Sequence, residues 1–329
     1  MRRIGARIAA ALLALAAVLA LIWALAPQDR VDREISFDPA RLGADLDQYL
    51  AREEARFPDI TPGTQKRILW AGAPGVQTPL AVVYLHGFSA TGQEIRPVPD
   101  EVAKALGANL FFTRLAGHGR GPDAMAEPEA GDWIEDTAEA LAIGRRLGQR
   151  VLVISTSTGG TLAAIAATDP LLNPDLAGIV MVSPNFGLRL RGAFLLDLPF
   201  ARVWAPWIAG DTLGVDTGNA ERARYWTTRY PSVAAFPMAA LLREARGLDY
   251  TRAKMPLLVI YAPEDQVIDP AAIWPVTQAW GGKVRIEPRQ MQAGDDPMRH
   301  VIAGDILSPG QTEAVVDLIL DWAKGWAQD

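Results

Sequence analysis

The sequence predicts an α/β fold, with a mostly parallel sheet, helices on both faces and a cap insertion over one edge of the sheet. Short apolar runs typical of strands alternate with helical patterns along much of the 329-residue chain, and this alternation is typical of a parallel sheet. The run 151–154 (VLVI) contains only apolar residues, as a strand buried on both faces requires. The alternation stops between 185 and 250, and this gap is too long for a simple crossover.

Residues 1–28 have the pattern of an N-terminal membrane anchor or an export signal. Three arginines precede the uncharged run 8–28, which is long enough as a helix to cross about 30 Å of hydrocarbon. The positive flank predicts a cytoplasmic N-terminus and an exported, periplasmic or extracellular, remainder. A cleaved signal peptide is the alternative, because 24–26 (ALA) resembles a cleavage site. The length of the run and the position of Pro27 directly after that site favour the uncleaved anchor.

The remaining chain divides into three parts. A tether and an N-terminal helix are expected over 29–78, because apolar residues recur there at helical spacing between charged ones. The α/β core is expected over 79–185 and 251–329. The segment 186–250, rich in Trp, Pro, Phe and Leu, is expected to form a cap over the carboxyl edge, where such sheets bind ligands. The expected strands are 66–71, 80–85, 109–114, 151–154, 178–182, 256–262 and 283–287, and the expected core helices are 99–106, 132–147, 161–168, 271–280 and 311–324.

The composition excludes several classes of site and partner. The chain has no cysteine, which excludes a thiol nucleophile, disulfides and thiolate metal sites. Its three histidines, His86, His118 and His300, are far apart in the sequence, so no metal site is expected. The net charge of −6 argues against a nucleic-acid partner.

The segment 155–160 (STSTGG) lies between an apolar strand and a helical run, where a nucleophilic serine can sit on a sharp turn. Such a turn brings the residues two before and two after the nucleophile together, so both must be small. Ser157 is flanked in this way by Ser155 and Gly159, whereas Ser155 would be flanked by the β-branched Val153. Ser157 is therefore the candidate nucleophile, at a helix start that favours a developing oxyanion. The alternative is a plain loop with hydroxyl caps.

A serine nucleophile needs a base and an acid that orients the base, and on a strand–turn–helix serine these follow in the order acid, then histidine. Asp265 follows a predicted strand and should lie level with Ser157; Glu264 and Asp269 are rival acids. His300 is the only histidine downstream of Ser157. The joint occurrence of these three residue types in this order indicates nucleophilic catalysis.

Two backbone N–H groups are expected to bind the oxyanion. One belongs to Thr158, directly after the nucleophile, and the other to Phe88, in the loop after the strand 80–85. Gly87 allows the backbone to approach a substrate closely. His86, in this loop, and His118 are expected to be structural.

Five motifs resemble the α/β-hydrolase superfamily, and within it the monoglyceride lipase, carboxylesterase and serine aminopeptidase-like group. The resemblance covers roughly 79–325 and implies that Ser157, Asp265 and His300 form a catalytic triad, that Phe88 and Thr158 line the oxyanion hole, and that the insertion is the family's cap. The motifs are HGFSA at 86–90, RLAGHG at 114–119, STSTGG at 155–160, APEDQVI at 262–268 and HVIAG at 300–304.

The sequence departs from the usual pattern of this group at two positions. Ser155 stands where glycine is usual, which keeps a small residue there. Arg299 precedes the histidine, where a small residue is common.

The expected activity is that of a serine hydrolase acting on carboxylic esters with an apolar acyl group, as in a carboxylesterase or monoacylglycerol lipase, with no metal or organic cofactor. The segment 193–210 contains only two charged residues, Asp197 and Arg202, so part of it is expected to line an acyl pocket for a lipid-like substrate or to face a bilayer. The same triad would serve a thioesterase, an amidase or peptidase, or an acyltransferase. A catalytically silent binding protein on the same fold is the alternative of a different class.

Overall fold

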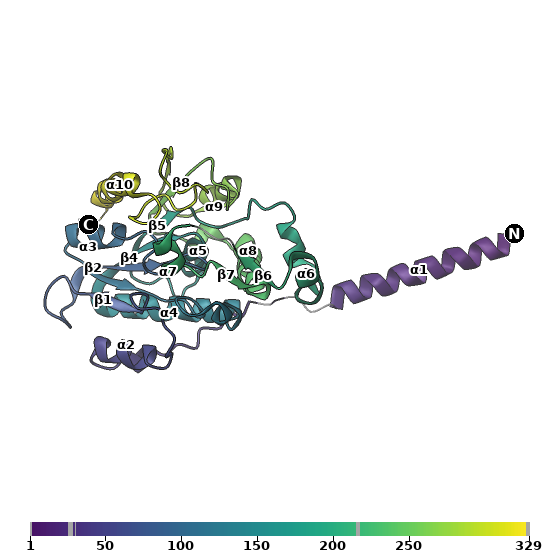
Figure 1. Cartoon of the computed structure of the whole chain (residues 1–329), viewed down its shortest axis with the longest axis horizontal. Helices are drawn as coiled ribbons and strands as arrows, with labels where there is room; N and C mark the ends of the chain where they lie inside the picture. Colours follow the sequence, from purple (N-terminus) through teal and green to yellow (C-terminus); the bar gives the residue numbers. More distant parts are fainter. Residues whose placement is uncertain (1, 26–28, 30, 215–217, 327–329) are drawn as a thin grey trace.

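The computed structural model describes residues 2–25, 29, 31–214 and 218–326. In this part of the chain seven strands form one sheet in the order β1-β3-β2-β4-β5-β8-β9 (Figure 1). The edge strand β1 runs antiparallel to β3, and every other neighbouring pair is parallel, so the predicted mostly parallel sheet is confirmed. The strands are β1 (Arg67–Leu69), β2 (Thr78–Leu85), β3 (Asn109–Phe112), β4 (Gly148–Thr156), β5 (Leu176–Val182), β8 (Leu257–Tyr261) and β9 (Val284–Pro288).

Two apolar cores lie on the two faces of the sheet, because alternate residues of each strand point to opposite faces. Val151 and Val153 of β4 belong to the core shared with α4 (Ala130–Leu147), α5 (Thr158–Thr168), α8 (Ala235–Arg246) and α9 (Ile273–Ala279). Leu152 and Ile154 belong to the core shared with α3 (Val98–Ala105) and α10 (Thr312–Lys324). Burial on both faces explains why the central strands are uninterrupted apolar runs.

The helix α4 begins at Ala130, before the expected start at 132. Glu129 is the N-cap, and its backbone N–H donates to Asp132 Oδ2 at 2.8 Å. This capping box adds two residues to the first turn. The expected positions of the other core helices agree with the structure to within about three residues at each end.

The segment 186–250 lies between β5 and β8 and is irregular. It contains a small antiparallel pair, β6 with β7. The helix α8 packs against α4 and α5 and so extends the helical layer of the core. The elements of this segment are η3 (Ala193–Asp197), α6 (Ala201–Ala209), β6 (Thr212–Gly214), α7 (Ala220–Tyr225), β7 (Arg229–Pro231), η4 (Ser232–Ala234) and α8.

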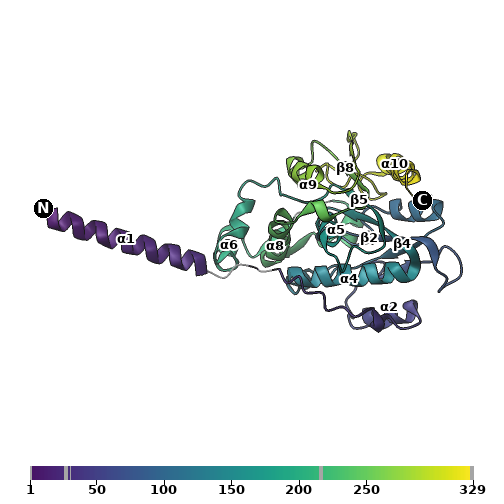
Figure 2. The same ribbon diagram turned by 180° about the vertical axis from the view of Figure 1, so that it is seen from behind.

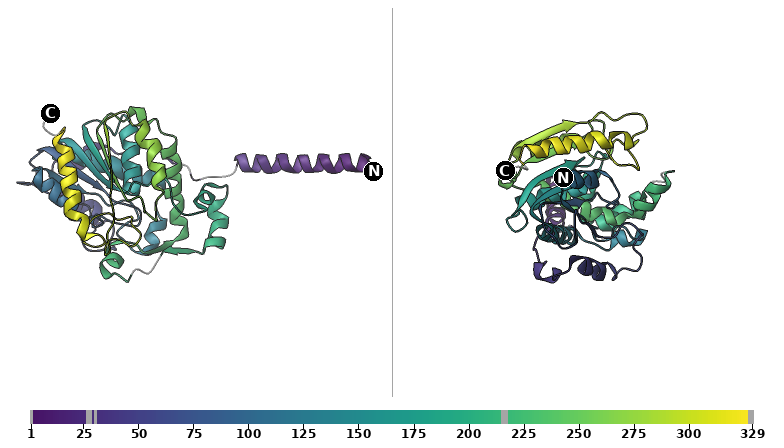
Figure 3. Two further views of the ribbon diagram at one scale, coloured as in Figure 1. Left: turned by 90° about the horizontal axis from the view of Figure 1, so that it is seen from above. Right: turned by 90° about the vertical axis from the view of Figure 1, so that its left-hand side faces the viewer.

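The N-terminal helix α1 (Arg2–Leu25) extends away from the body of the protein, and its C-terminal end lies beside α6 (Figures 1 and 2). The left view of Figure 3 shows the same separation from above. The side chains of residues 3–25 are exposed, and α1 is long and apolar enough to cross a membrane. Ala26 and Pro27, on which the cleaved-signal alternative depends, lie outside the described residues.

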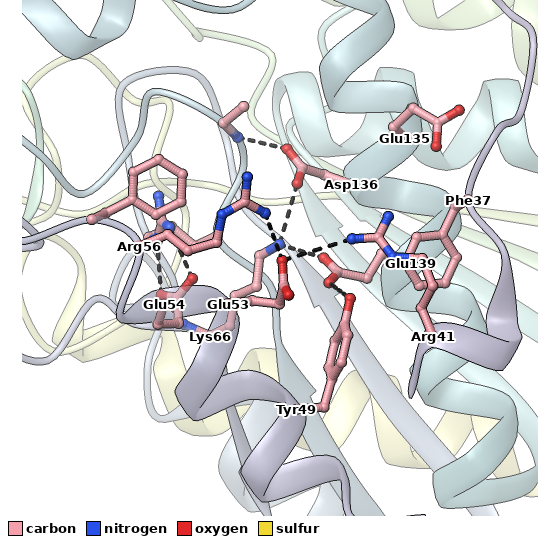
Figure 4. Close-up of a pocket in the computed structure, with 13 residues that line it drawn as sticks. Phe37, Arg41, Tyr49, Glu53, Glu54, Arg56, Lys66, Glu135, Asp136 and Glu139 are labelled. Carbon is pink, nitrogen blue, oxygen red and sulfur yellow. Dashed lines mark hydrogen bonds and ion pairs between the residues drawn. The ribbon is translucent and has the colours of Figure 1, made fainter. Parts of the chain in front are cut away.

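A buried ion-pair network joins the helix α2 (Leu46–Glu54) and the residue before β1 to α4 (Figure 4). Lys66 lies between Asp136, with Nζ 3.3 Å from Oδ1, and Glu139. Glu139 also accepts from the Tyr49 hydroxyl at 2.6 Å. Burial lowers the pKa of Lys66, but the two carboxylates outweigh it and hold the ammonium charged. The network borders a cavity of about 200 Å³ and holds α2 on the core.

Candidate active site

Ser157 occupies a strained turn between β4 and α5. Its φ of 51° and ψ of −117° are unusual for a residue with a side chain. The Ser157 N–H donates to Val182 O of β5 at 3.0 Å. A Cβ on Gly159 would lie 2.1 Å from Leu85 O of β2, so the turn closes only around glycine. The ends of two neighbouring strands therefore hold the serine at the carboxyl edge of the sheet.

The two serines of this segment have different environments. Ser155 is fully buried in β4, and its Oγ donates to Val180 O at 2.9 Å. Ser157 is 6 % exposed and lines a large cavity. The geometry therefore favours Ser157 as the nucleophile.

His300 and Asp265 lie side by side. His300 Nδ1 is 2.8 Å from Asp265 Oδ2, and the other carboxylate oxygen accepts the backbone N–H groups of Val267 at 2.8 Å and Ile268 at 3.0 Å. Because an ionised carboxylate only accepts, Nδ1 carries the proton and Nε2 is left as the base. Burial lowers the pKa of His300, but the hydrogen bond and the charge of Asp265 outweigh burial and raise it above 6.5.

The rival acids point elsewhere. Glu264 and Asp269 are exposed. Asp269 caps the short helix η6 (Pro270–Ala272), where its Oδ1 accepts the Ala271 N–H at 3.0 Å. Asp265 is fully buried, and its carboxylate is the one that contacts His300.

Asp296 is a site residue that the sequence reasoning missed. It is 1 % exposed, and its Oδ2 accepts the backbone N–H groups of His300 at 3.0 Å and Val301 at 2.9 Å. It thereby fixes the loop that carries the histidine. The only signal in the sequence is an aspartate a few residues before the histidine, and the adjacent Asp295 carries the same signal.

The loop after β2 is shaped by His86. The Leu115 N–H donates to His86 Nε2 at 3.1 Å, so the proton lies on Nδ1, which donates to Gly87 O at 2.9 Å. Burial lowers the pKa of His86 well below 6.5, so the ring is neutral. His118 is also buried, with its pKa lowered to about 4, and its Nδ1 lies 2.9 Å from Ala116 O. Both histidines therefore act as loop supports.

The loop and the turn meet at Gly87, where a Cβ would lie 3.1 Å from Ser157 Cβ. Phe88 follows Gly87 in the loop, and Thr158 begins α5. Among the described residues, the N–H groups of Phe88 and Thr158 donate to no protein acceptor. These two groups remain our proposed oxyanion donors, because both flank the nucleophile and both are free to bind a substrate oxygen.

Ser157 and His300 line a cavity of about 830 Å³, within the range of small-molecule sites. Most of its apolar lining side chains come from the segment 186–250, and these residues are called the apolar wall below. The lining also includes polar groups, among them Glu94 and Asp296. Within the described chain, no three His, Cys, Asp or Glu side chains are grouped to hold a metal ion. The apolar wall includes Leu190, Leu195, Leu196, Trp204, Ile208 and Leu213.

Comparisons with known proteins agree with this geometry. Residues 82–304 match the model of the alpha/beta hydrolase family. A thermostable monoacylglycerol lipase of Bacillus sp. (strain H-257) is 30 % identical over 207 residues, which cover 58 % of this chain and 73 % of that protein.

Solved structures share the fold. A solved structure from work on the metagenome-derived lipolytic enzymes LipS and LipT has a TM-score of 0.64 at 21 % identity. The match covers 81 % of this chain and 99 % of that one. A monoglyceride lipase from Saccharomyces cerevisiae has a TM-score of 0.55 at 14 % identity, with 78 % and 90 % covered. These likenesses support the α/β-hydrolase fold of the sheet and helices.

We expect Ser157→Ala to lower ester turnover by several orders of magnitude, because the covalent step loses its nucleophile. Ser155→Ala removes only a hydroxyl that is bonded within β4, so it should keep labelling by a fluorophosphonate probe. Labelling and p-nitrophenyl ester turnover of both purified variants measure this. Loss of labelling in Ser155→Ala with labelling kept in Ser157→Ala would refute the assignment.

We expect Asp265→Asn to lower turnover by about 10³- to 10⁴-fold, because the imidazole loses its orienting anion. Turnover needs neutral His300, so in the native protein it falls as pH drops through the raised pKa of His300. In Asp265→Asn this acid limb should move to lower pH, since the charge that raised the pKa is gone. Asp269→Asn is the control, and a larger loss there would transfer the role to Asp269. The pH profile of kcat/KM measures the shift.

Proposed function

This chain belongs to the alpha/beta hydrolase family, and from that premise we propose that it is a serine hydrolase that cleaves carboxylic esters with an apolar acyl group. It is a hydrolase of the lipase and esterase type. The observation that carries the proposal is the hydrogen-bonded pair of His300 and Asp265, with Ser157 lining the same cavity.

In the proposed mechanism, Ser157 Oγ attacks the ester carbonyl while His300 Nε2 takes its proton. Asp265 keeps the proton on Nδ1 and stabilises the imidazolium that forms. The N–H groups of Phe88 and Thr158 donate to the oxyanion of the tetrahedral intermediate. His300 then protonates the leaving alcohol, which departs and leaves the acyl group on Ser157. A water molecule activated by His300 hydrolyses this acyl-enzyme.

The apolar wall of the cavity supports the choice of acyl group. Leu195, Leu196 and Trp204 come from the segment 186–250 and line the same cavity as Ser157. A small acyl group such as acetyl would leave most of this wall uncovered. The similar Bacillus protein is a monoacylglycerol lipase, which agrees with a carboxylic ester as the substrate.

We further propose that α1 anchors the protein in a membrane with the catalytic part on the exported side. Its flanking arginines favour a cytoplasmic N-terminus. Asp29, just beyond the helix, forms an ion pair with Arg202 of α6, with Oδ1 2.6 Å from Nε. Neighbouring side chains of α6 are exposed and apolar: Val203 at 64 % and Trp207 at 89 %. This surface would lie near the bilayer beside the anchor, where Trp is favoured.

A panel of p-nitrophenyl esters tests the proposed substrate class. Their acyl chains range from about two to sixteen carbons, which roughly covers the ligand sizes that small-molecule pockets hold. Each methylene buried against the apolar wall contributes up to about 0.8 kcal/mol. The measured kcat/KM should therefore rise several-fold per pair of carbons until the pocket is full. A strict preference for acetate, or for thioester or peptide substrates offered in parallel, would contradict the proposal.

The anchor is tested by mass spectrometry of the mature protein from the membrane fraction. Because the run after the arginines is long and uncharged, we expect the N-terminal segment to be present in the mature chain. A mature N-terminus at or just after Pro27, with the protein in the soluble exported fraction, would instead establish a cleaved signal.

A further inference from the structure

Glu94 is a buried carboxyl beside the candidate active site to which the triad assigns no role. It is 2 % exposed, and it lines the same cavity as Ser157 and His300. Its Oε2 accepts the backbone N–H of Gly87 at 2.8 Å and the hydroxyl of Tyr84 at 3.0 Å. A buried carboxylate is costly unless such donors satisfy it. Glu94 accepts from β2 and from the loop 86–90 that follows β2, here called the oxyanion loop, and this placement requires an explanation.

Two hydrogen bonds hold the peptides on either side of the Gly87 Cα, next to a proposed oxyanion donor. Gly87 O accepts from His86 Nδ1 at 2.9 Å, and Gly87 N–H donates to Glu94. Because the peptide bond is planar, holding Gly87 O also sets the direction of the Phe88 N–H on the same peptide. His86 therefore sets the direction of the Phe88 N–H through Gly87 O, and Glu94 holds the preceding peptide in place through the Gly87 N–H.

The same carboxyl is connected to the turn that carries the nucleophile. The Tyr84 hydroxyl, which donates to Glu94, also lies 3.0 Å from Thr156 Oγ1, one residue before Ser157. A Cβ on Gly87 would lie 2.8 Å from Glu94 Oε1 and 3.1 Å from Ser157 Cβ. Glu94 and Ser157 thus face each other across the bare Cα of Gly87.

The charge of Glu94 acts on His300. Burial raises the pKa of Glu94 to about 7, and the Gly87 N–H and the charge of His300 oppose this rise. Asp296, on the His300 loop, adds to it. From β2, Tyr84 stays protonated because burial raises its pKa well above 10. In return, an ionised Glu94 raises the pKa of His300.

We propose that Glu94 is a positioning residue for catalysis: it fixes the oxyanion loop through the Gly87 N–H, and its carboxylate stabilises the His300 imidazolium across the cavity. The proposal rests on the serine-hydrolase function proposed above. It separates two effects. The first needs only an acceptor oxygen at position 94, whereas the second needs a negative charge there.

Two substitutions distinguish these effects. Glu94→Ala leaves the Gly87 N–H without an acceptor, so kcat should fall by about 10- to 100-fold, somewhat less than for loss of an oxyanion donor itself, with KM nearly unchanged. Glu94→Gln keeps an acceptor oxygen and should restore most of kcat. Its acid limb of kcat/KM should move to lower pH, because the charge that raises the pKa of His300 is gone. The measurements are kcat, KM and pH profiles with a short p-nitrophenyl ester.

Glu139→Gln is the matched control, because Glu139 is a buried carboxyl on α4, in the network with Lys66 and Tyr49. It should change thermal stability and leave kcat and the pH profile unchanged. Wild-type kcat in folded Glu94→Ala would overturn the loop role, and an unshifted pH profile in Glu94→Gln would overturn the charge role. If Glu94→Ala does not fold, Glu94→Gln still decides through its pH profile. Absence of ester turnover in the wild type would overturn the proposed function, and the role of Glu94 with it.

Discussion

The strained backbone at Ser157 is the constraint on which the rest of the site depends. A positive φ at a serine persists only when its surroundings determine it. Here the Ser157 N–H is bonded to Val182 O of β5, and the Ser157 carbonyl accepts the Asn185 N–H at 3.0 Å. On the other side, Gly159 packs directly on the end of β2 at Leu85. The parallel register of β2, β4 and β5 thus presents the serine at the carboxyl edge, and the loops that serve it follow the ends of these strands and of their neighbours.

Buried carboxylates organise three of these loops, each by accepting backbone N–H groups. Asp265 accepts two in the loop after β8, Asp296 accepts two at His300, and Glu94 accepts one at Gly87. Loops lack the regular hydrogen bonds of helices and strands, so buried N–H groups need side-chain acceptors. The acceptors also leave negative charge around a histidine that becomes a cation in the proposed mechanism. Loop structure and electrostatics are therefore coupled at this site.

The segment 186–250 has two surfaces with different surroundings. Its inner side chains, such as Leu196 and Trp204, line the catalytic cavity. Trp207 on α6 is exposed, and α6 is tied to the chain beyond α1 by the ion pair of Arg202 with Asp29. A partly exposed ion pair contributes little to stability, but this one holds the segment 186–250 near the end of the apolar helix. In the proposed function, the segment 186–250 would then line the substrate cavity and also lie beside the bilayer.

The sequence by itself determined the class of sheet, because short uninterrupted apolar runs alternating with helical patterns are typical of parallel strands buried on both faces. Local sterics around Ser157 likewise singled out that serine over Ser155 before any tertiary contact was known. Only the tertiary structure placed the carboxylate of Asp265, and not those of its neighbours, against the histidine, because the direction of a loop side chain depends on contacts distant in sequence. For the same reason Glu94 and Asp296 could not be recognised: their partners are backbone N–H groups, which every residue except proline carries, so no residue pattern identifies them.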